Sequence, residues 1–203
     1  MVNALKSKQI DSIRIYERVG NYITAKNSDM QWEMNEPVTK DNFCFALRKN
    51  NDALKKEFDD AILSLKKDGA FDKLVNTYID AADFTKPFPA VEMPHFDGAP
   101  TIKVAVTGDL PPFDYVNSDG KPAGFNIAFL AEISKRLNKN FELVYINSGA
   151  RSVELTSDKV DVVFWAVTPN ENNSLPADFD TPNDVALTVP YLAEDIVYVK
   201  LRK

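Results

Sequence analysis

The chain has 203 residues, of which 44% are hydrophobic and 27% are charged, so it is long enough to bury a core as one large domain or two small ones. Its formal net charge is -6, and its 24 lysines and arginines are scattered along the sequence. A phosphate-rich partner needs a concentrated basic surface, so we expect no nucleic-acid ligand.

The sequence pattern also argues against a membrane-spanning segment and against a metal site. No apolar run approaches the roughly 20 residues that cross a bilayer, and the first residues, MVNALKSKQIDS, lack the apolar core of a secretory signal. We therefore expect any export signal or anchor to lie outside this sequence. One cysteine, Cys44, excludes an internal disulfide, and one histidine, His95, leaves too few ligands for a His/Cys metal cluster. No metal and no cofactor are expected.

The first part of the chain predicts short strands followed by two helices. Residues 2–8 are typical of the end of a helix, and strands are expected within residues 9–19 and 42–49. Helical spacing of apolar residues predicts a helix over residues 50–69 and a second over residues 70–79. The inward positions of the first helix are Leu54, Phe58, Ile62 and Leu65. Asn51 or Asp52 is expected to cap its start, and Gly69 to close its end.

A proline-rich segment divides the chain. Residues 85–100, TKPFPAVEMPHFDGAP, hold four of the 12 prolines. Proline lacks a backbone N–H and restricts the residue before it, so no helix or strand should persist here. We interpret this segment as a linker.

After the linker, strands and helices alternate. Strands are expected at TIKVAVT (101–107), FELVYI (141–146), KVDVVFWAV (159–167) and IVYVK (196–200). GFNIAFLAEISKRLNK (124–139) predicts a helix capped near Asn126, and a shorter helix should end about Ser157. This alternation predicts an α/β fold with a central, mainly parallel sheet flanked by helices, because parallel strands require crossover connections.

Two stretches of the sequence resemble a known family. DLPPFDYVNSDGKPAGFNIAFLAEISKRLNK, KVDVVFWAVT and VPYLAEDIVYV together resemble the opening lobe of the family 3 solute-binding proteins of polar amino-acid ABC transporters. ALRKNNDALKKEFDDAILSLKKDGAFDKLVNTYI resembles that family's closing segment. The resemblance implies a periplasmic-binding-protein-like lobe and a periplasmic or extracellular location.

The order of these stretches differs from the family's order, because the closing segment comes first. The resemblance assigns residues 1–43 to the tail of a second lobe, 44–84 to the closing segment of a first lobe, 85–100 to the linker and 101–203 to the opening segment of a first lobe. Two origins fit: a cut across two tandem binding domains, or a circular permutation. We expect residues 44–84 to pack on residues 101–203 as one lobe, since the helix carrying Phe58 has no second partner in this chain.

By resemblance, a ligand cleft lies between the loops TGDLPPF (107–113) and FWAVTPNENN (164–173). Burying the charges of an amino acid requires a cation for its carboxylate and a carboxylate for its ammonium. The family's arginine would fall at or near Asn173, yet no arginine or lysine occurs between Lys159 and Lys200. The expected carboxylate clamp is therefore missing.

Other anchors of the family are altered as well. Thr107 stands where an acidic residue is expected, with Asp109 as a neighbouring substitute, and Tyr16 replaces a second acidic residue beside Glu17. Small positions of the second loop hold a tryptophan and Ala166, and Ser148 stands near the expected stacking aromatic. The candidate ligand-binding residues are Asp109, Leu110, Phe113, Trp165, Thr168, Tyr16 and Glu17.

These residues also have purely structural interpretations. Trp165 and Phe113 are as typical of a core as of a ligand platform, Asp109 of a turn cap and Glu17 of a solvated surface. Residues 174–187, SLPADFDTPNDVAL, are typical of a surface loop near the cleft mouth.

Three function classes remain open. The first is an extracytoplasmic solute-binding domain for transport or sensing, with a small polar solute and a membrane permease or sensor receptor as partners, acting as a monomer or swapped dimer. The second is a structural or protein-binding remnant of such a domain. The third is an enzyme of the dehydratase type on the same fold. No nucleophile with a base, no metal set and no GxGxxG occurs, so we expect no catalysis and no catalytic residue.

Overall fold

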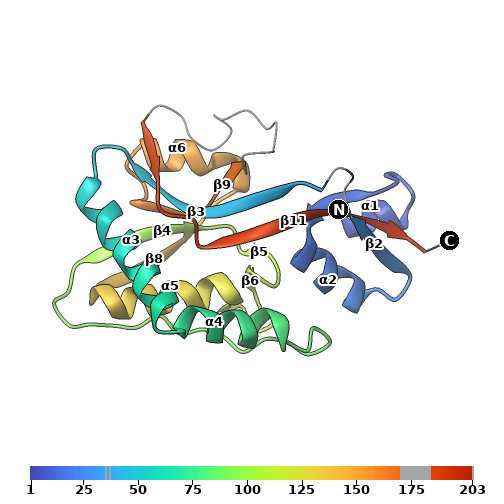
Figure 1. Cartoon of the computed structure of the whole chain (residues 1–203), viewed down its shortest axis with the longest axis horizontal. Coiled ribbons are helices and arrows are strands. Elements are labelled where there is room, and N and C mark those ends of the chain that lie inside the picture. The colour runs from blue at the N-terminus through green and yellow to red at the C-terminus, as the bar shows by residue number, and fades with distance from the viewer. Residues whose placement is uncertain (35, 37, 170–183, 203) are drawn as a thin grey trace.

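The computed structural model describes residues 1–34, 36, 38–169 and 184–202, without the side chains of Trp165 and Pro169 (Figure 1). Its helices are α1 (Val2–Lys6), α2 (Glu17–Lys26), α3 (Asp52–Lys67), α4 (Ala70–Val75), α5 (Phe125–Leu137) and α6 (Arg151–Thr156), with a π-helical turn η1 (Asn76–Asp80) and a 3-10 turn η2 (Ser148–Ala150). Its strands are β1 (Ile13–Tyr16), β2 (Met30–Met34), β3 (Lys40–Arg48), β4 (Thr101–Val106), β5 (Asp109–Leu110), β6 (Asp114–Val116), β7 (Pro122–Ala123), β8 (Asn140–Tyr145), β9 (Val162–Pro169), β10 (Val185–Leu187) and β11 (Leu192–Leu201).

The main sheet confirms the α/β fold with a large central sheet but corrects its predicted direction. The strand order is β1-β11-β3-β9-β4-β8, and among the described residues only the pairs of β4 with β8 and with β9 are parallel. These three strands are joined through α5 and α6, as crossover connections require. The prediction of a mainly parallel sheet was wrong because β3 precedes the linker and enters between β9 and β11, antiparallel to both.

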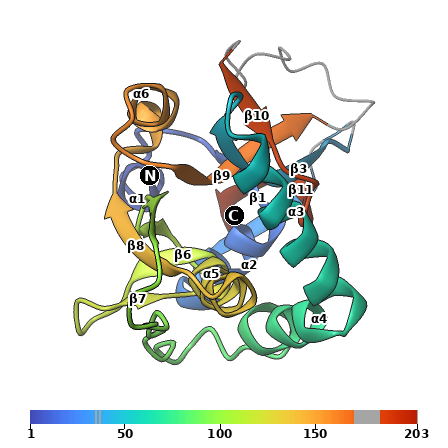
Figure 2. The ribbon, with the colours of Figure 1, turned by 90° about the vertical axis from the view of Figure 1, so that its left-hand side faces the viewer.

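The two faces of this sheet are covered by different helices (Figure 2). The alternation of side chains along the strands shows which helices cover each face. Val104 and Val106 of β4 join the large cluster under α3 and α5, whereas Ala105 between them joins a smaller cluster that includes Leu155 of α6. Side chains of a strand point alternately to opposite faces, so α3 and α5 cover one face and α6 the other.

The expected packing of residues 44–84 on the part after the linker is confirmed. Phe58 of α3 is fully buried, with its ring stacked on Phe141 of β8 at 5.7 Å and edge-on to Phe45 of β3 at 5.3 Å. The predicted helix ends are also observed. The Asn51 side chain accepts from the backbone N–H of Leu54 at 3.3 Å, and Gly69 has φ +78°.

Two local predictions were wrong. The segment 9–19 is a strand only over Ile13–Tyr16, and helix α2 begins at Glu17. Helix α5 begins after Gly124, and Asn126 is a buried residue inside it rather than its cap. Gly124 has φ +107°, and a Cβ there would lie 2.4 Å from the carbonyl oxygen of Phe113, so a glycine is required where the chain turns into α5.

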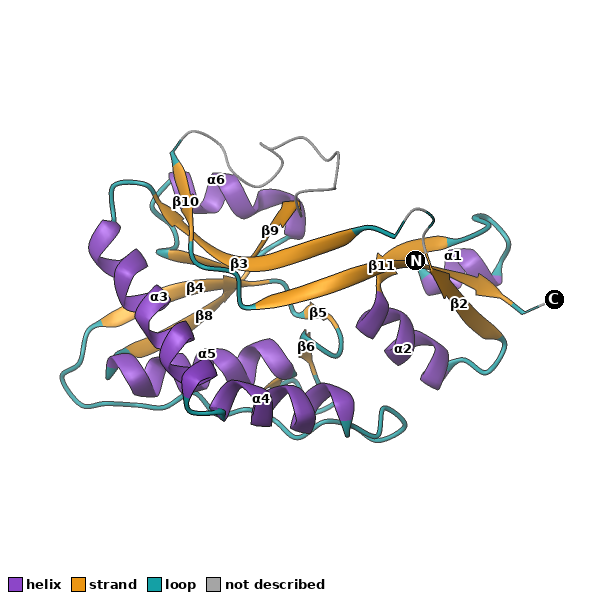
Figure 3. Ribbon diagram, in the orientation of Figure 1, coloured by secondary structure: helices purple, strands orange, loops and turns teal. Residues whose placement is uncertain are grey.

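Strand β11 connects two parts of the molecule (Figure 3). Its residues 192–195 pair with β3, and its residues 196–201 pair with β1 and β2. We call residues 1–34 and 196–202 the small subdomain, and residues 40–169 and 184–195 the main subdomain. Strand β3 runs without a break across residues 43 and 44, where the sequence analysis places a boundary between two segments.

Residues 85–100 form no helix or strand, as their prolines predict. They are nevertheless attached to the main subdomain. The backbone N–H of Val91 donates to the Pro122 carbonyl at 2.9 Å, that of Phe96 donates to the Asn140 side chain at 2.8 Å, and the Phe88 ring stacks on Tyr78. The linker is thus attached to β7, β8 and η1.

The aromatic core gives a direct test of the fold. Phe58→Ala should lower the free energy of unfolding by about 3–5 kcal/mol, because it leaves a cavity between β3, β8 and α3. Chemical denaturation measures this. The matched control is Leu63→Ala on the same helix, whose side chain is 53% exposed and whose loss should cost less than about 0.5 kcal/mol. Equal effects of the two substitutions would contradict this packing.

Candidate functional site

The loop after β4 is held by one buried carboxylate. Oδ2 of Asp114 accepts the backbone N–H groups of Thr107 at 2.7 Å and Gly108 at 3.1 Å, and the Thr107 hydroxyl at 3.1 Å. Burial raises the pKa of the Asp114 carboxyl, although these three hydrogen bonds lower it. Thr107 stands where the family resemblance leads us to expect an acidic residue. Its backbone N–H and its hydroxyl are both bonded to Asp114.

The predicted residues of this loop have different exposures. Asp109 is exposed on β5, where it pairs with Tyr115. Leu110 is partly buried against the core, and Phe113 is completely buried. In this structure only Asp109 offers a polar side chain of the loop freely to solvent.

Aromatic rings fill the space between this loop and the small subdomain. The Tyr16 ring lies edge-on to Phe43 at 4.8 Å, and Phe43 lies edge-on to Phe113 at 5.5 Å. Tyr16 is the last residue of β1 and directly precedes Glu17, the first residue of α2. The structure thus links Tyr16 to Phe113 through Phe43, a residue that the sequence analysis did not select.

The second predicted loop is described only in part. Thr168 lies on β9 opposite Asn42 of β3 and makes a side-chain hydrogen bond with Cys44. Burial raises the pKa of the Cys44 thiol to about 11, so this cysteine stays protonated at neutral pH. The Trp165 side chain and Asn173 lie outside the described residues.

A buried ion pair near Glu17 escaped the sequence analysis. The guanidinium of Arg18 contacts the carboxylate of Glu194, whose side chain is 0% exposed. The two residues are separated by 176 positions, so no local pattern joins them. The only signal available was the presence of a cation next to the candidate Glu17.

Arg18 and Glu17 line an open groove of about 470 Å³ between the two subdomains. Its other walls include Asn21 of α2, Lys40 of β3 and the segment 79–84 after α4. Glu17 is the only member of the predicted site in this groove, so the groove is separate from the loop that carries Asp109.

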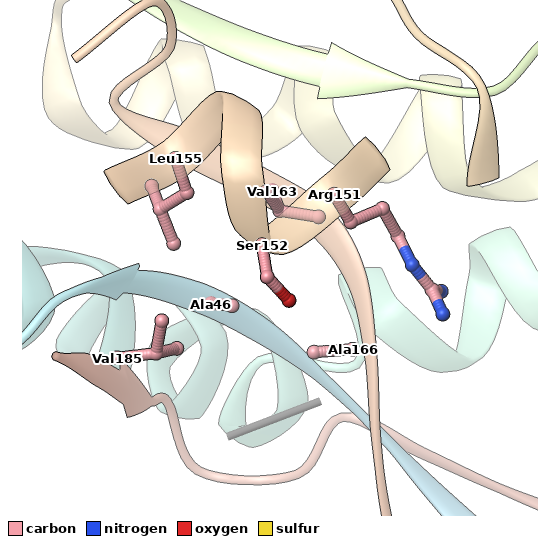
Figure 4. Close-up of a pocket in the computed structure, with 7 residues that line it drawn as sticks. All are labelled: Ala46, Arg151, Ser152, Leu155, Val163, Ala166 and Val185. Carbon is pink, nitrogen blue, oxygen red and sulfur yellow. The ribbon is translucent and has the colours of Figure 1, made fainter. Parts of the chain in front are cut away.

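A second hollow, between α6 and the sheet, is much smaller (Figure 4). Its volume is about 10 Å³, which holds about one water molecule and no solute. It is lined mainly by apolar side chains of α6 and of the sheet, including Leu155, Ala46, Val163, Ala166 and Val185.

The described part of the chain offers neither a metal site nor a membrane-spanning helix. No group of three or more His, Cys, Asp or Glu side chains there is placed to hold a metal ion. None of the described helices combines the length and the apolar character that a bilayer span requires.

Comparison with known proteins finds relatives for part of the chain. Residues 102–200 match the model of the bacterial extracellular solute-binding proteins, family 3. The predicted family resemblance is confirmed for this part of the chain. An L-cystine-binding protein of Escherichia coli (strain K12) is 30% identical over 86 residues, and a probable ABC transporter arginine-binding protein of Chlamydia trachomatis (serovar D) is 26% identical over 100 residues.

These matches are partial. They cover 42% and 48% of this chain, and 32% and 35% of the two relatives, so the chain spans about a third of their length. Among solved structures, NikA of Staphylococcus aureus in complex with Ni(L-His)2 gives a TM-score of 0.50 at 10% identity, covering 100% of this chain and 55% of that protein. That likeness shows the fold alone.

The buried Glu194 predicts a pH dependence of stability. Burial raises the pKa of this carboxyl from 4.5 to about 7, although Arg18 lowers it. Between pH 4.5 and about 7, Glu194 is ionised in the unfolded chain but keeps its proton in the folded chain. The contribution of Glu194 to the free energy of unfolding is therefore full below pH 4.5 and is lost as pH rises through 7. Relative to Glu194→Gln, the free energy of unfolding should fall by up to about 3 kcal/mol over this range.

Urea denaturation of both proteins at a series of pH values measures this difference. The glutamine cannot titrate, so all other groups cancel in the comparison. Parallel stability curves would show that the carboxyl has the same pKa in the folded and unfolded chains.

Proposed function

We propose that this chain is an extracytoplasmic solute-binding domain, serving transport or sensing, whose amino-acid site is altered. The observation that carries the proposal is the family 3 match of residues 102–200, supported by two relatives that are named for binding cystine and arginine. The same match supports a non-catalytic role, since the family is described by solute binding.

Electrostatics supports the altered site. No arginine or lysine occurs between Lys159 and Lys200, so the segment after the second loop supplies no cation for a carboxylate. A hydrogen bond to a charged group is worth about 1.5–3 kcal/mol, and its loss weakens binding about tenfold to a hundredfold. A free α-amino acid should therefore bind poorly.

We propose that the solute is small, polar, and neutral or cationic. Asp109 is exposed at the loop and has no ion pair among the described residues, so it is available to an ammonium or hydroxyl group. On the side of the main subdomain, the proposed solute site would also include Leu110, Phe113, Trp165 and Thr168. On the opposite side it would include Tyr16 and Glu17. Phe113 can contact a solute only if its loop opens, because it is fully buried here.

The subdomains agree with the proposed domain assignment only in part, because residues 196–202 belong to the small subdomain and β3 crosses residue 43. We propose that residues 1–43 are the tail of a second lobe, that 44–84 and 101–203 form the first, and that 85–100 link them, through a tandem junction or a permutation. The small subdomain has only the strands β1 and β2 beside β11 among its described residues. Its partners would be a membrane permease or a sensor receptor, with the chain a monomer or a swapped dimer.

A ligand screen tests the function. We expect a thermal-shift screen of small polar solutes to give at least one neutral or cationic compound, and calorimetry to find no standard α-amino acid with micromolar affinity. Asp109→Ala should weaken the binding of that compound at least tenfold, because it removes a charged contact.

The matched control is Asp119→Ala, an exposed aspartate in the turn beyond β6, which should leave binding unchanged. A screen without any ligand would favour the remnant of a binding domain. Micromolar binding of an amino acid that Asp109→Ala abolishes would show that the site is not altered as proposed.

A further inference from the structure

The contact between Arg18 and Glu194 has the form of a ligand site. Nη1 of Arg18 donates to Oε1 of Glu194 and, at 3.4 Å, to the Ala193 carbonyl, while the backbone N–H of Arg18 points to Oε2 at 3.5 Å. Arg18 is the second residue of α2, a helix of ten residues. The carboxylate therefore receives both a guanidinium and a first-turn N–H, which are the two groups that proteins use to bind anionic solutes.

This carboxylate also lies where the two subdomains meet. Glu194 pairs with Asp41 of β3 in the main sheet, and two residues later Ile196 pairs with Tyr16 in the small subdomain. Arg18 belongs to the small subdomain, so the ion pair connects helix α2 to the main-sheet half of β11. In binding proteins that close around a solute, the solute makes such a connection.

Other contacts hold the subdomains together at the same side. The Tyr22 ring of α2 lies edge-on to Phe84 at 5.7 Å and 6.4 Å from Tyr115 of β6, and the Lys26 ammonium donates to the Thr85 carbonyl at 3.1 Å. The subdomains are thus connected by side chains of the chain itself, with Glu194 as the buried anion among them.

Arg18 is the main positive charge next to Glu194, because the other charged neighbours of Glu194 are acidic or paired elsewhere. Asp41 lies opposite Glu194 on β3, and Glu17 of α2 acts on Glu194 as a further negative charge. Lys40, the neighbour of Asp41 in the sequence, pairs with Asp195 at 3.4 Å. A carboxylate without Arg18 would be buried among acidic groups, so the position depends on this guanidinium.

We propose that Glu194 is a built-in occupant of a carboxylate-binding position formed by Arg18 and the first turn of α2, and that a solute carboxylate enters this position only by exchange with Glu194. The approach is open, because the Arg18 side chain is 28% exposed and lines the groove of about 470 Å³. Its Nε and Nη2 atoms make no hydrogen bond within the described residues, so they are available to an entering carboxylate. The occupied position adds a second reason for poor binding of amino acids.

Acetate tests the occupancy, because it replaces the atoms that Glu194→Ala removes beyond Cβ. The E194A protein should melt below the wild type, and sodium acetate should raise its melting temperature at constant ionic strength with chloride as the balancing anion. Above the dissociation constant of acetate, the melting temperature should rise by about 3–6 °C for each tenfold increase in acetate concentration.

The controls are the wild type, whose position is filled, and the double variant E194A/R18M, which lacks the guanidinium. Both should show the same small change of melting temperature with acetate, well below that of E194A. An acetate response of E194A no larger than that of the wild type would overturn the proposal. This probe does not require the natural solute, so its failure is distinguishable from failure of the proposed solute-binding function.

If E194A does not fold, R18M carries the test. Methionine removes the guanidinium and leaves Glu194 without this cation, so hydrogen exchange of the α2 amides should become at least several times faster. Unchanged exchange in α2, with Phe58 of the main subdomain still protected in both proteins, would refute the role of the carboxylate in holding α2.

Discussion

Strand β11 has to satisfy its backbone hydrogen bonds with two sets of partners, and this requirement organises the molecule. Up to Asp195 it bonds to β3, and from Ile196 it bonds to β1 and β2. Backbone N–H and C=O groups buried without partners are costly, so the position of this change fixes where the small subdomain begins. Helix α2 follows β1 directly, and its first turn is thereby brought to Glu194. The groove and the ion pair both follow from this one change of partner.

Much of the fold could be predicted because its signals are local. The apolar spacing from Leu54 to Leu65 predicts α3, and the alternation after the linker predicts the crossover unit of β4, β8 and β9. The direction of β3 could not be predicted. Its neighbours in the sheet lie more than a hundred residues away, and no crossover helix constrains it. Helix α2 was missed because the strand-like run that ends at Tyr16 passes directly into Glu17, and no side chain caps the start of the helix.

The candidate site shows the same division between local and distant signals. The loop around Asp109 was found because prolines end a strand there, and the structure places it after β4 as expected. The burial of Phe113 agrees with its interpretation as a core residue, and the charged Asp109, four positions earlier, is exposed. The Arg18–Glu194 pair could not be predicted from the segment after the second loop. That segment has no cation, and the guanidinium comes from the opposite end of the chain.

The pairing of β1 and β2 has a consequence for behaviour in solution. Within the described residues each of them bonds to β11 alone, so each presents a row of unsatisfied backbone groups on its outer side. Such rows are templates for strands of other molecules and promote aggregation. Both strands carry charged side chains, the exposed Arg14 on β1 and Glu33 on β2, and charges on outermost strands oppose that association. These charges thereby oppose aggregation through the outer edges of β1 and β2, although both edges could still pair with a further strand.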